Sequence, residues 1–389
     1  MNKLINNNRL RIIFAITIVS VMGVASLTPA FPKMADTLNL TKVQIGLLIS
    51  AFAFPGIFLA PILGIIADRV GRKEILVPSL FLFAIAGFGI FFIHDFKIMV
   101  VLRVFQGIGA ASLGALNTTL IGDFFEDEQR SVAMGYNASI LSISTGVYPL
   151  VGGVLASFAW FYPFILPLLA IPIALLVFND LPEPKIQKTA NIKQYLKAIS
   201  CNISKKEVIG VFVLGVFTFI ILYGAFITYF PILLHQRFGF SSTLIGVIFS
   251  LTSIMAALVA SQIGKLTNTF GSLTLLKVAF LLYFIVCMSI PFVHSIYFLI
   301  LLVPLFGIAQ ALNMPSLQII LANIAPDEQR AAFMSLNGMV IRLGQTLGPI
   351  IIGIGYAVYS VQGAYFFASV IAIIGIIILL TMFSKLKST

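Results

Sequence analysis

The residues most capable of chemistry lie in a short charged segment between two long apolar runs. The segment reads Gly64-Ile-Ile-Ala-Asp68-Arg69-Val-Gly71-Arg72-Lys73. An aspartate four positions before an arginine can form a charge-assisted contact, and glycine permits a tight turn and a close backbone approach. Asp123, at the end of a later apolar run, is the candidate third member of this charged set. The alternative is that the cations of the segment only orient the chain in a membrane.

Two arginines, Arg103 and Arg342, fall inside apolar runs, where a charge is costly and usually faces a cavity or a polar partner. The first could instead extend to a nearby membrane surface. The other polar residues within the runs are mostly amides, which either contact a substrate or hydrogen-bond one helix to another. No acidic residue of the sequence falls near the middle of a run. This charge pattern favours neutral or anionic ligands over cations.

The elements that must carry these residues are membrane-spanning helices. The chain has 389 residues, of which 60% are hydrophobic and 10% charged, whereas a soluble protein carries about 25% charged residues. The apolar runs are each near the roughly 20 residues that cross the hydrocarbon core of a bilayer. We therefore predict an all-α integral membrane protein with twelve transmembrane helices, near residues 11–33, 43–63, 75–93, 98–120, 131–157, 163–179, 209–230, 242–263, 273–293, 296–319, 331–356 and 364–384.

The two halves of the chain repeat one another at a constant offset of 200 residues. The identities fall on glycine, proline and polar positions, among them Gly46 and Gly246, Ser50 and Ser250, Gly71 and Gly271, and Pro149 and Pro349. Six helices per half is an even number, so both halves run the same way through the membrane. We predict two pseudo-symmetric six-helix bundles, over residues 1–179 and 209–389, joined by a cytoplasmic linker over residues 180–208.

Lysine and arginine predict the orientation of the chain. With the N-terminus inside, eighteen of these residues fall in inner segments and four in outer loops. We expect a multi-pass protein of the cell (cytoplasmic) membrane with both termini in the cytoplasm. Apolar residues of the linker, Ile192, Tyr195, Leu196 and Ile199, recur at helical spacing. They predict either an amphipathic helix on the membrane surface or a solvated linker helix.

Residues 64–76 resemble the signature loop between spans two and three of the major facilitator superfamily. The whole chain is similar to that family's twelve-span drug:proton antiporters. The resemblance implies that the charged set is a lock across helices, which holds the outward-open state. The residues of this candidate lock are Gly64, Asp68, Arg69, Gly71, Arg72 and Asp123.

The resemblance extends to two further motifs and to the cavity. Arg103, Gln106 and Gly107 match the span-four motif, which implies a role in proton transfer or in helix packing. Span five resembles the antiporter motif, although Ser144 and Tyr148 stand where glycines are usual. Its matching residues are Gly135, Pro149, Gly152 and Gly153. By the same resemblance, substrate contacts are expected at Asn117, Tyr223, Gln310, Asn313 and Arg342.

These patterns predict a secondary active transporter, a proton-coupled exporter of small amphipathic compounds that works by alternating access. A dedicated exporter of one metabolite, such as a siderophore, a peptide antibiotic or a sugar, is the alternative. An intramembrane enzyme would need clustered catalytic side chains within the spans, and a primary pump would need a nucleotide-binding motif; the sequence has neither. We expect no catalytic residue, metal or cofactor. The expected partners are a small-molecule substrate, protons and the lipid bilayer. The net charge of +11 is spread over connectors, which argues against nucleic acid, and we expect a monomer.

Overall fold

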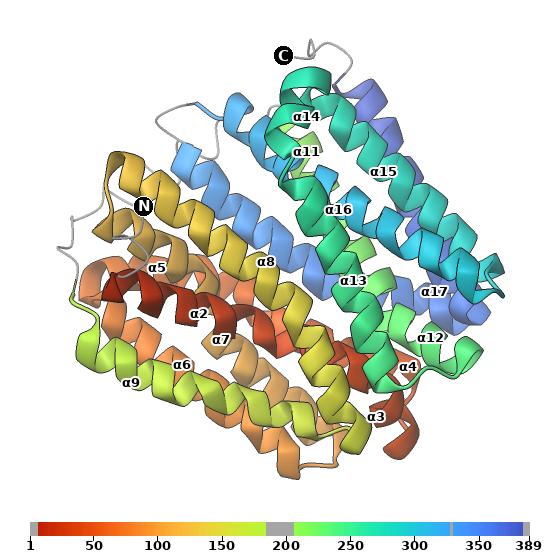
Figure 1. The fold of residues 1–389 in the computed structure, drawn as a ribbon, viewed down its shortest axis with the longest axis horizontal. Coiled ribbons are helices and arrows are strands. Elements are labelled where there is room, and N and C mark those ends of the chain that lie inside the picture. The colour runs from red at the N-terminus through yellow and green to blue at the C-terminus, as the bar shows by residue number, and fades with distance from the viewer. Residues whose placement is uncertain (1–6, 184–205, 327–329, 384–389) are drawn as a thin grey trace. The chain divides into compact units, whose positions relative to one another are not determined.

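The computed structural model describes residues 7–183, 206–326 and 330–383 (Figure 1). The predicted amphipathic helix of the linker lies outside these residues. The described chain is helical throughout its regular elements. Its first half contains α2 (Asn8–Ala25), η1 (Thr28–Ala30), α3 (Phe31–Thr37), α4 (Lys42–Ala53), α5 (Pro55–Val70), α6 (Arg72–Gly89), η2 (Ile90–Phe92), α7 (Phe96–Phe124), α8 (Asp127–Phe158), η3 (Tyr162–Leu169) and α9 (Ala170–Asp180). Its second half contains α11 (Lys206–Ile220), η4 (Ile221–Tyr229), α12 (Phe230–Phe238), α13 (Ser242–Ala260), α14 (Ile263–Phe270), α15 (Ser272–Ser289), η5 (Ile290–Phe292), α16 (Ile296–Ile324) and α17 (Arg330–Thr381).

Eleven helical segments among the described residues are long and apolar enough to cross a membrane, against the twelve predicted. The all-helical membrane class is thus confirmed, and the number differs because the last segment, Leu336–Thr381, is 46 residues long. This segment belongs to α17, which contains non-helical backbone at Tyr359 and Ser360. Roughly 20 residues cross the hydrocarbon core, so the segment has the length of two crossings. A break at this place coincides with the connection expected between the last two spans.

The offset of 200 residues recurs in the bounds of the helices. Helix α6 (Arg72–Gly89) corresponds to α15 (Ser272–Ser289), and α7 (Phe96–Phe124) to α16 (Ile296–Ile324). The glycine that precedes each first helix has positive φ, 118° at Gly71 and 78° at Gly271. Side chains disfavour this region, so glycine is the residue that turns the chain there. The sequence repeat is therefore also a repeat of local structure.

The helices fall into two compact units whose bounds differ from the halves of the sequence. Unit 1 contains residues 1–40, 51–189 and 241–250, and unit 2 contains residues 41–50, 190–240 and 251–389. In unit 1, α6 packs against α7 and α9, and α2 packs against α7 and α8 (Figure 1). In unit 2, α17 packs against α11 and α15. Each unit thus includes a short segment from the other half of the sequence.

The segments 41–50 and 241–250 make equivalent contacts in their respective units. In unit 2, Ser50 Oγ donates to the carbonyl of Thr346 at 2.7 Å. In unit 1, Ser250 Oγ donates to the carbonyl of Gly146 at 2.5 Å. Both donors and both acceptors are related by the offset of 200. Close glycine contacts accompany them, because a Cβ at Gly46 would lie 3.1 Å from Pro349 Cβ and one at Gly246 would lie 2.3 Å from Pro149 O.

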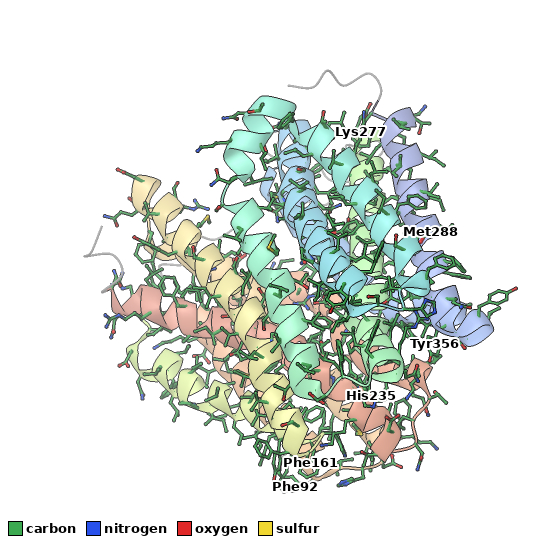
Figure 2. All side chains as sticks on the ribbon, turned by 45° about the vertical axis from the view of Figure 1, so that its right-hand side comes forward. Phe92, Phe161, His235, Lys277, Met288 and Tyr356 are labelled. Atoms are coloured by element: carbon green, nitrogen blue, oxygen red, sulfur yellow. The ribbon has the colours of Figure 1, made fainter. Side chains whose placement is uncertain are left out.

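Two of the four cations that the sequence assigns to the outer side bind backbone carbonyls at helix ends. Lys33 Nζ donates to the carbonyl of Ser157 at 2.9 Å, at the end of α8. Arg237 Nη1 donates to the carbonyls of Pro291 and Val293, each at 2.9 Å, beyond α15. Cations at the C-terminal end of a helix are stabilised by its dipole. In Figure 2, His235 and Lys277 lie at opposite ends of unit 2, with Tyr356 near the end that holds His235.

Candidate functional site

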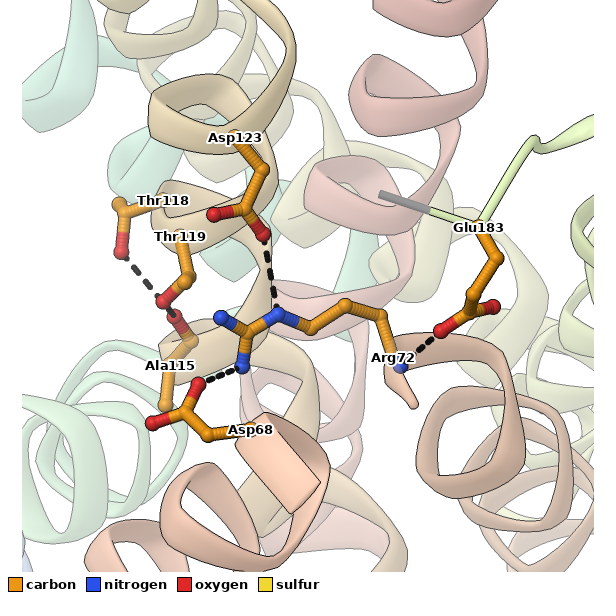
Figure 3. Close-up of polar contacts among 7 residues, drawn as sticks. All are labelled: Asp68, Arg72, Ala115, Thr118, Thr119, Asp123 and Glu183. Atoms are coloured by element: carbon orange, nitrogen blue, oxygen red, sulfur yellow. Dashed lines mark hydrogen bonds and ion pairs between the residues drawn. The ribbon is translucent and has the colours of Figure 1, made fainter. Parts of the chain in front are cut away.

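Four residues lie around the start of α6, and we call them the charge cluster: Asp68, Arg72, Asp123 and Glu183 (Figure 3). Arg72 forms ion pairs with Asp68 and, through Nε at 3.0 Å, with Asp123 Oδ2. The side chain of Arg72 is 11% exposed and those of both aspartates are 26% exposed. Exposed ion pairs contribute little to stability, but one largely buried guanidinium shared by two carboxylates joins α5, α6 and α7 at a single point.

Glu183 binds the backbone where α6 begins. Its Oε1 accepts the N–H of Arg72 at 2.5 Å, and in return Lys73 Nζ donates to the carbonyl of Phe178 at 2.8 Å. A carboxylate is favourable at a helix N-terminus, and a cation is favourable near a C-terminus. Glycine is required at position 71 for two reasons: its φ is 118°, and an added Cβ would lie 2.6 Å from Glu183 Oε1. The end of α9 and the start of α6 are thus bound reciprocally.

Other residues of the candidate lock have a different place. Arg69 is exposed to the surroundings of unit 1. At Gly64, an added Cβ would meet no described atom within 4 Å. A close backbone approach was the expected reason for this glycine, and the structure does not support that reason. Of the predicted lock residues, the structure therefore brings Asp68, Gly71, Arg72 and Asp123 together.

We expect Glu183→Gln to lower the free energy of unfolding by about 0.5–1.5 kcal/mol, because the amide oxygen keeps the hydrogen bond but loses the charge at the N-terminus of α6. Thermal unfolding in detergent measures the change. Glu74→Gln is the matched control, since Glu74 lies in the first turn of α6 and is exposed. An equal effect of both substitutions would show that the contact of Glu183 has no special role.

Arg103 is buried in unit 1, with 1% of its surface exposed. Its Nη1 donates to the carbonyl of Gly23 at 2.9 Å and to Gln106 Oε1 at 2.8 Å, and its guanidinium lies 4.5 Å from the ring centre of Phe52. The alternative of a side chain that extends to the membrane surface is therefore wrong. Arg103 connects α7 with α2 and α4, an arrangement that fits the predicted packing role.

The motif glycines of spans four and five include positions of close helix contact. An added Cβ at Gly107 would overlap the carbonyl oxygen of Phe52, and one at Gly152 would overlap that of Ser26. At Gly153 the Cβ would lie 2.5 Å from Ser242 O. Small residues allow such approaches between helices in a membrane. Gly135 differs, because its Cβ would meet no described atom within 4 Å.

Two of the predicted substrate contacts are instead buried between helices. Asn117, 4% exposed, donates through Nδ2 to Thr17 Oγ1 at 2.5 Å, and Thr17 Oγ1 also lies 2.5 Å from Asn137 Oδ1. Asn313, 0% exposed, accepts the hydroxyl of Thr218 through Oδ1 at 2.9 Å. Each unit thus contains a buried threonine–asparagine contact between its first and fourth long helices. Hydrogen bonding between helices is the role that these contacts support.

Tyr223, Gln310 and Arg342 are the predicted contacts that are partly exposed. Tyr223 and Arg342 belong to elements of unit 2 that pack closely, because an added Cβ at Gly348 of α17 would lie 3.0 Å from the backbone nitrogen of Gly224, the residue after Tyr223. Tyr223 belongs to η4, a nine-residue π-helix in which Thr228 Oγ1 donates to the carbonyl of Tyr223 at 2.6 Å. Such wide turns are rare and frequently mark functional sites. Gln310, also partly exposed, lies on α16.

Sequence reasoning missed four participants of these sites. It gave no role to Glu183 or to the hydroxyls of Thr17 and Thr218, and it did not pair Gln345 with Arg342. Glu183 follows directly on the end of span six, and the two threonines are 201 residues apart. The signal for Glu183 was a carboxylate next to a helix end. The signal for the two threonines was their near-match to the repeat of 200 residues.

Known proteins resemble this chain over most of its length. A sequence model of the Major Facilitator Superfamily matches residues 13–303 and 238–388. Multidrug resistance protein 1 of Bacillus subtilis strain 168 is 25% identical over 377 residues, which cover 95% of each chain. The bacillibactin exporter of the same strain is 25% identical over 357 residues, which cover 86% of each chain. A solved variant of the nucleoside transporter NupG has the same fold, with a TM-score of 0.79 at 17% identity over 97% of this chain and 100% of that one.

Proposed function

This chain belongs to the major facilitator superfamily, and we propose that it is a secondary active exporter of small amphipathic compounds, driven by the proton gradient. The observation that carries the proposal is the similarity to a multidrug resistance protein over 95% of the chain. The family and the internal repeat of the chain support alternating access as the mechanism. Substrate and protons are the proposed ligands, and the protein acts as a monomer in the bilayer.

We propose that the charge cluster is the conformational lock of this transporter. Arg72 holds Asp68 at the end of α5 and Asp123 at the end of α7, while Glu183 holds the start of α6. A contact that forms in one state and opens in another shifts the balance between the two states by its own free energy. This supports the expected role, because the cluster joins several helices through one side chain.

The proposed topology has twelve spans, with α17 counted as two, and both termini in the cytoplasm. The proposed bundles are residues 1–179 and 209–389, with the linker at residues 180–208. The non-helical backbone at Ser360, which has φ 54°, supports a turn at that position. The lysine and arginine distribution of the sequence supports the orientation.

Labelling from outside the cell tests this topology. We expect Ser360→Cys to react with a membrane-impermeant maleimide in intact cells, because Ser360 is exposed and lies in the proposed outer turn. Lys277→Cys, at the proposed inner side, should react only after the cells are permeabilised. A variant in which Cys201 is replaced by serine provides the background, since the remaining Cys287 is buried. Labelling of residue 277 from outside would overturn the orientation.

Transport in proteoliposomes tests the function. With an imposed pH gradient, we expect several unrelated neutral or anionic amphipathic compounds to move against their concentration, and a protonophore should abolish the movement. Asp68→Asn provides a variant control with the same membrane insertion. Movement of no compound in the panel, or movement that the protonophore leaves unchanged, would contradict a proton-driven exporter.

A dedicated exporter of one metabolite is the second candidate, and a specific similarity favours it. The bacillibactin exporter and the multidrug resistance protein are each 25% identical to this chain, the exporter over a smaller share of it. The same panel separates the two functions. A single transported metabolite among many compounds would favour the dedicated exporter.

A further inference from the structure

Arg342 is a cation embedded in the apolar helix α17 of unit 2. Its Nη1 donates to Gln345 Oε1 at 3.2 Å, one turn along α17. Within the described part of unit 2 the one carboxylate side chain is that of Glu207, in the first turn of α11. The ion pairs found among the described residues do not include Arg342. A charge kept half-buried without a counter-charge is costly and usually serves a ligand.

Close packing brings the element that carries Tyr223 alongside α17. An added Cβ at Gly344 would lie 2.7 Å from Val216 O, and one at Gly348 would lie 3.0 Å from Gly224 N. These glycines fix α17 alongside α11 and the π-helix η4. Tyr223 precedes Gly224, so it lies on the part of η4 that packs against α17, and it stays partly exposed. The ring of Phe219, centred 6.1 Å from that of Tyr223, adds an apolar surface.

The segment 41–50 contacts the face of α17 that carries Arg342. One turn further along, the carbonyl of Thr346 accepts Ser50 Oγ, and Pro349 lies against Gly46. Ser50 is the last residue of the segment 41–50 in unit 2. Arg342 occupies the turn of α17 before these contacts, and the residue is partly exposed.

We propose that Arg342, Gln345 and Tyr223 form a subsite for the carboxylate group of an amphipathic substrate. The proposal rests on the exporter function and names a substrate class for it. A guanidinium presents its N–H groups in a planar fork that matches the two oxygens of a carboxylate. Gln345 orients the fork, the hydroxyl of Tyr223 donates a further hydrogen bond, and Phe219 contacts the apolar part. The carboxylate supplies a counter-charge, since no ion pair of Arg342 is found among the described residues.

Two probes of the same ring and different charge test this subsite: 1-naphthaleneacetate and 1-naphthaleneacetamide. Their affinities are measured by calorimetry on the full chain in lipid nanodiscs. We expect the wild type to bind the carboxylate at least tenfold more tightly than the amide, which is about 1.4 kcal/mol. Arg342→Gln should lower the affinity for the carboxylate far more than that for the amide, and so remove this preference. A size-exclusion profile and an unfolding temperature like those of the wild type show that the variant is folded.

Three further variants sharpen the result. Arg342→Lys keeps the charge but loses the fork, so part of the preference should remain. Tyr223→Phe should reduce the preference severalfold. Lys265→Gln removes one cation from an exposed position of unit 2 and should change neither affinity. A wild type without a preference for the carboxylate, or an equal preference in Arg342→Gln, would overturn the subsite.

Transport of neutral compounds by the same variants separates the subsite from the function. Proton-driven export of neutral compounds, together with a carboxylate affinity that does not depend on Arg342, contradicts the subsite alone. An Arg342-dependent preference in a protein that exports none of the panel contradicts the exporter function alone. Export of the neutral amide that persists in Arg342→Gln, with lost export of the carboxylate, supports both.

Discussion

Asp68→Asn is expected to reduce proton-driven transport roughly tenfold while the amount of folded protein in the membrane stays near that of the wild type. Asp68 is one of two carboxylates that hold Arg72. A hydrogen bond to a charged group is worth about 1.5–3 kcal/mol, and about 1.4 kcal/mol changes an equilibrium tenfold. Loss of the contact therefore shifts a balanced pair of conformations strongly. Initial rates in proteoliposomes at matched protein content measure the effect.

The neighbouring cation provides the control for this prediction. Arg69→Gln changes the charge of the same segment by one unit at an exposed position and should retain most of the transport. Asp123→Asn should act like Asp68→Asn, and the double variant should cost less than the sum of the two because both carboxylates share Arg72. Wild-type transport by Asp68→Asn, with unchanged distances between labelled helix ends, would show that the cluster is not a lock.

Gly107→Ala is expected to lower the free energy of unfolding by several kcal/mol and to reduce the folded yield strongly. The added Cβ would overlap the carbonyl oxygen of Phe52. A backbone atom cannot move aside as the end of a flexible side chain can, so α7 and α4 must separate, and overpacking of this kind costs about 1–3 kcal/mol or more. Separation would also pull Phe52 from the guanidinium of Arg103. Thermal unfolding monitored by size-exclusion chromatography measures the loss.

Two glycines of the same motifs serve as controls. Gly64→Ala and Gly135→Ala place a Cβ where no described atom lies within 4 Å. Both lie inside helices, where alanine is favoured over glycine by about 1 kcal/mol. We expect these variants to be as stable as the wild type or more stable. If all three substitutions lowered the unfolding temperature equally, the backbone contact at Gly107 would not be the cause.

The membrane class and the repeat could be read from the sequence because both depend on patterns that survive without tertiary information. Apolar length predicts a span, and Gly71 and Gly271 mark the same turn in both halves. The number of spans in the last region differs between sequence and structure, because α17 runs as one helical segment across a short non-helical break at Tyr359 and Ser360. The exchange of segments 41–50 and 241–250 depends on long-range packing, which no local pattern of the sequence encodes.

Some contacts of the candidate site could likewise be predicted from the sequence, and others could not. The contact between Asp68 and Arg72 was predictable because oppositely charged residues four apart, next to a glycine turn, have few other arrangements in a membrane. The contact of Glu183 with the N–H of Arg72 was not predicted from the sequence. The placement of Asn117 and Asn313 was not predictable either, because an amide on an apolar helix can face a cavity or a neighbouring helix with the same spacing. Their threonine partners decide between the two, and these come from helices about 100 residues away.

The segment 241–250 also sets an order of events during synthesis. Unit 1 is complete only when this segment has been made, although the rest of the unit ends at residue 189. At about 5–20 residues per second, the intervening chain takes roughly 3–12 s to translate. Throughout this interval the surfaces at Pro149 and Gly153 that later contact Gly246 and Ser242 stand uncovered. A fragment that stops in the linker therefore leaves unit 1 unfinished, and no cut between the two halves yields two pieces that each contain a whole unit.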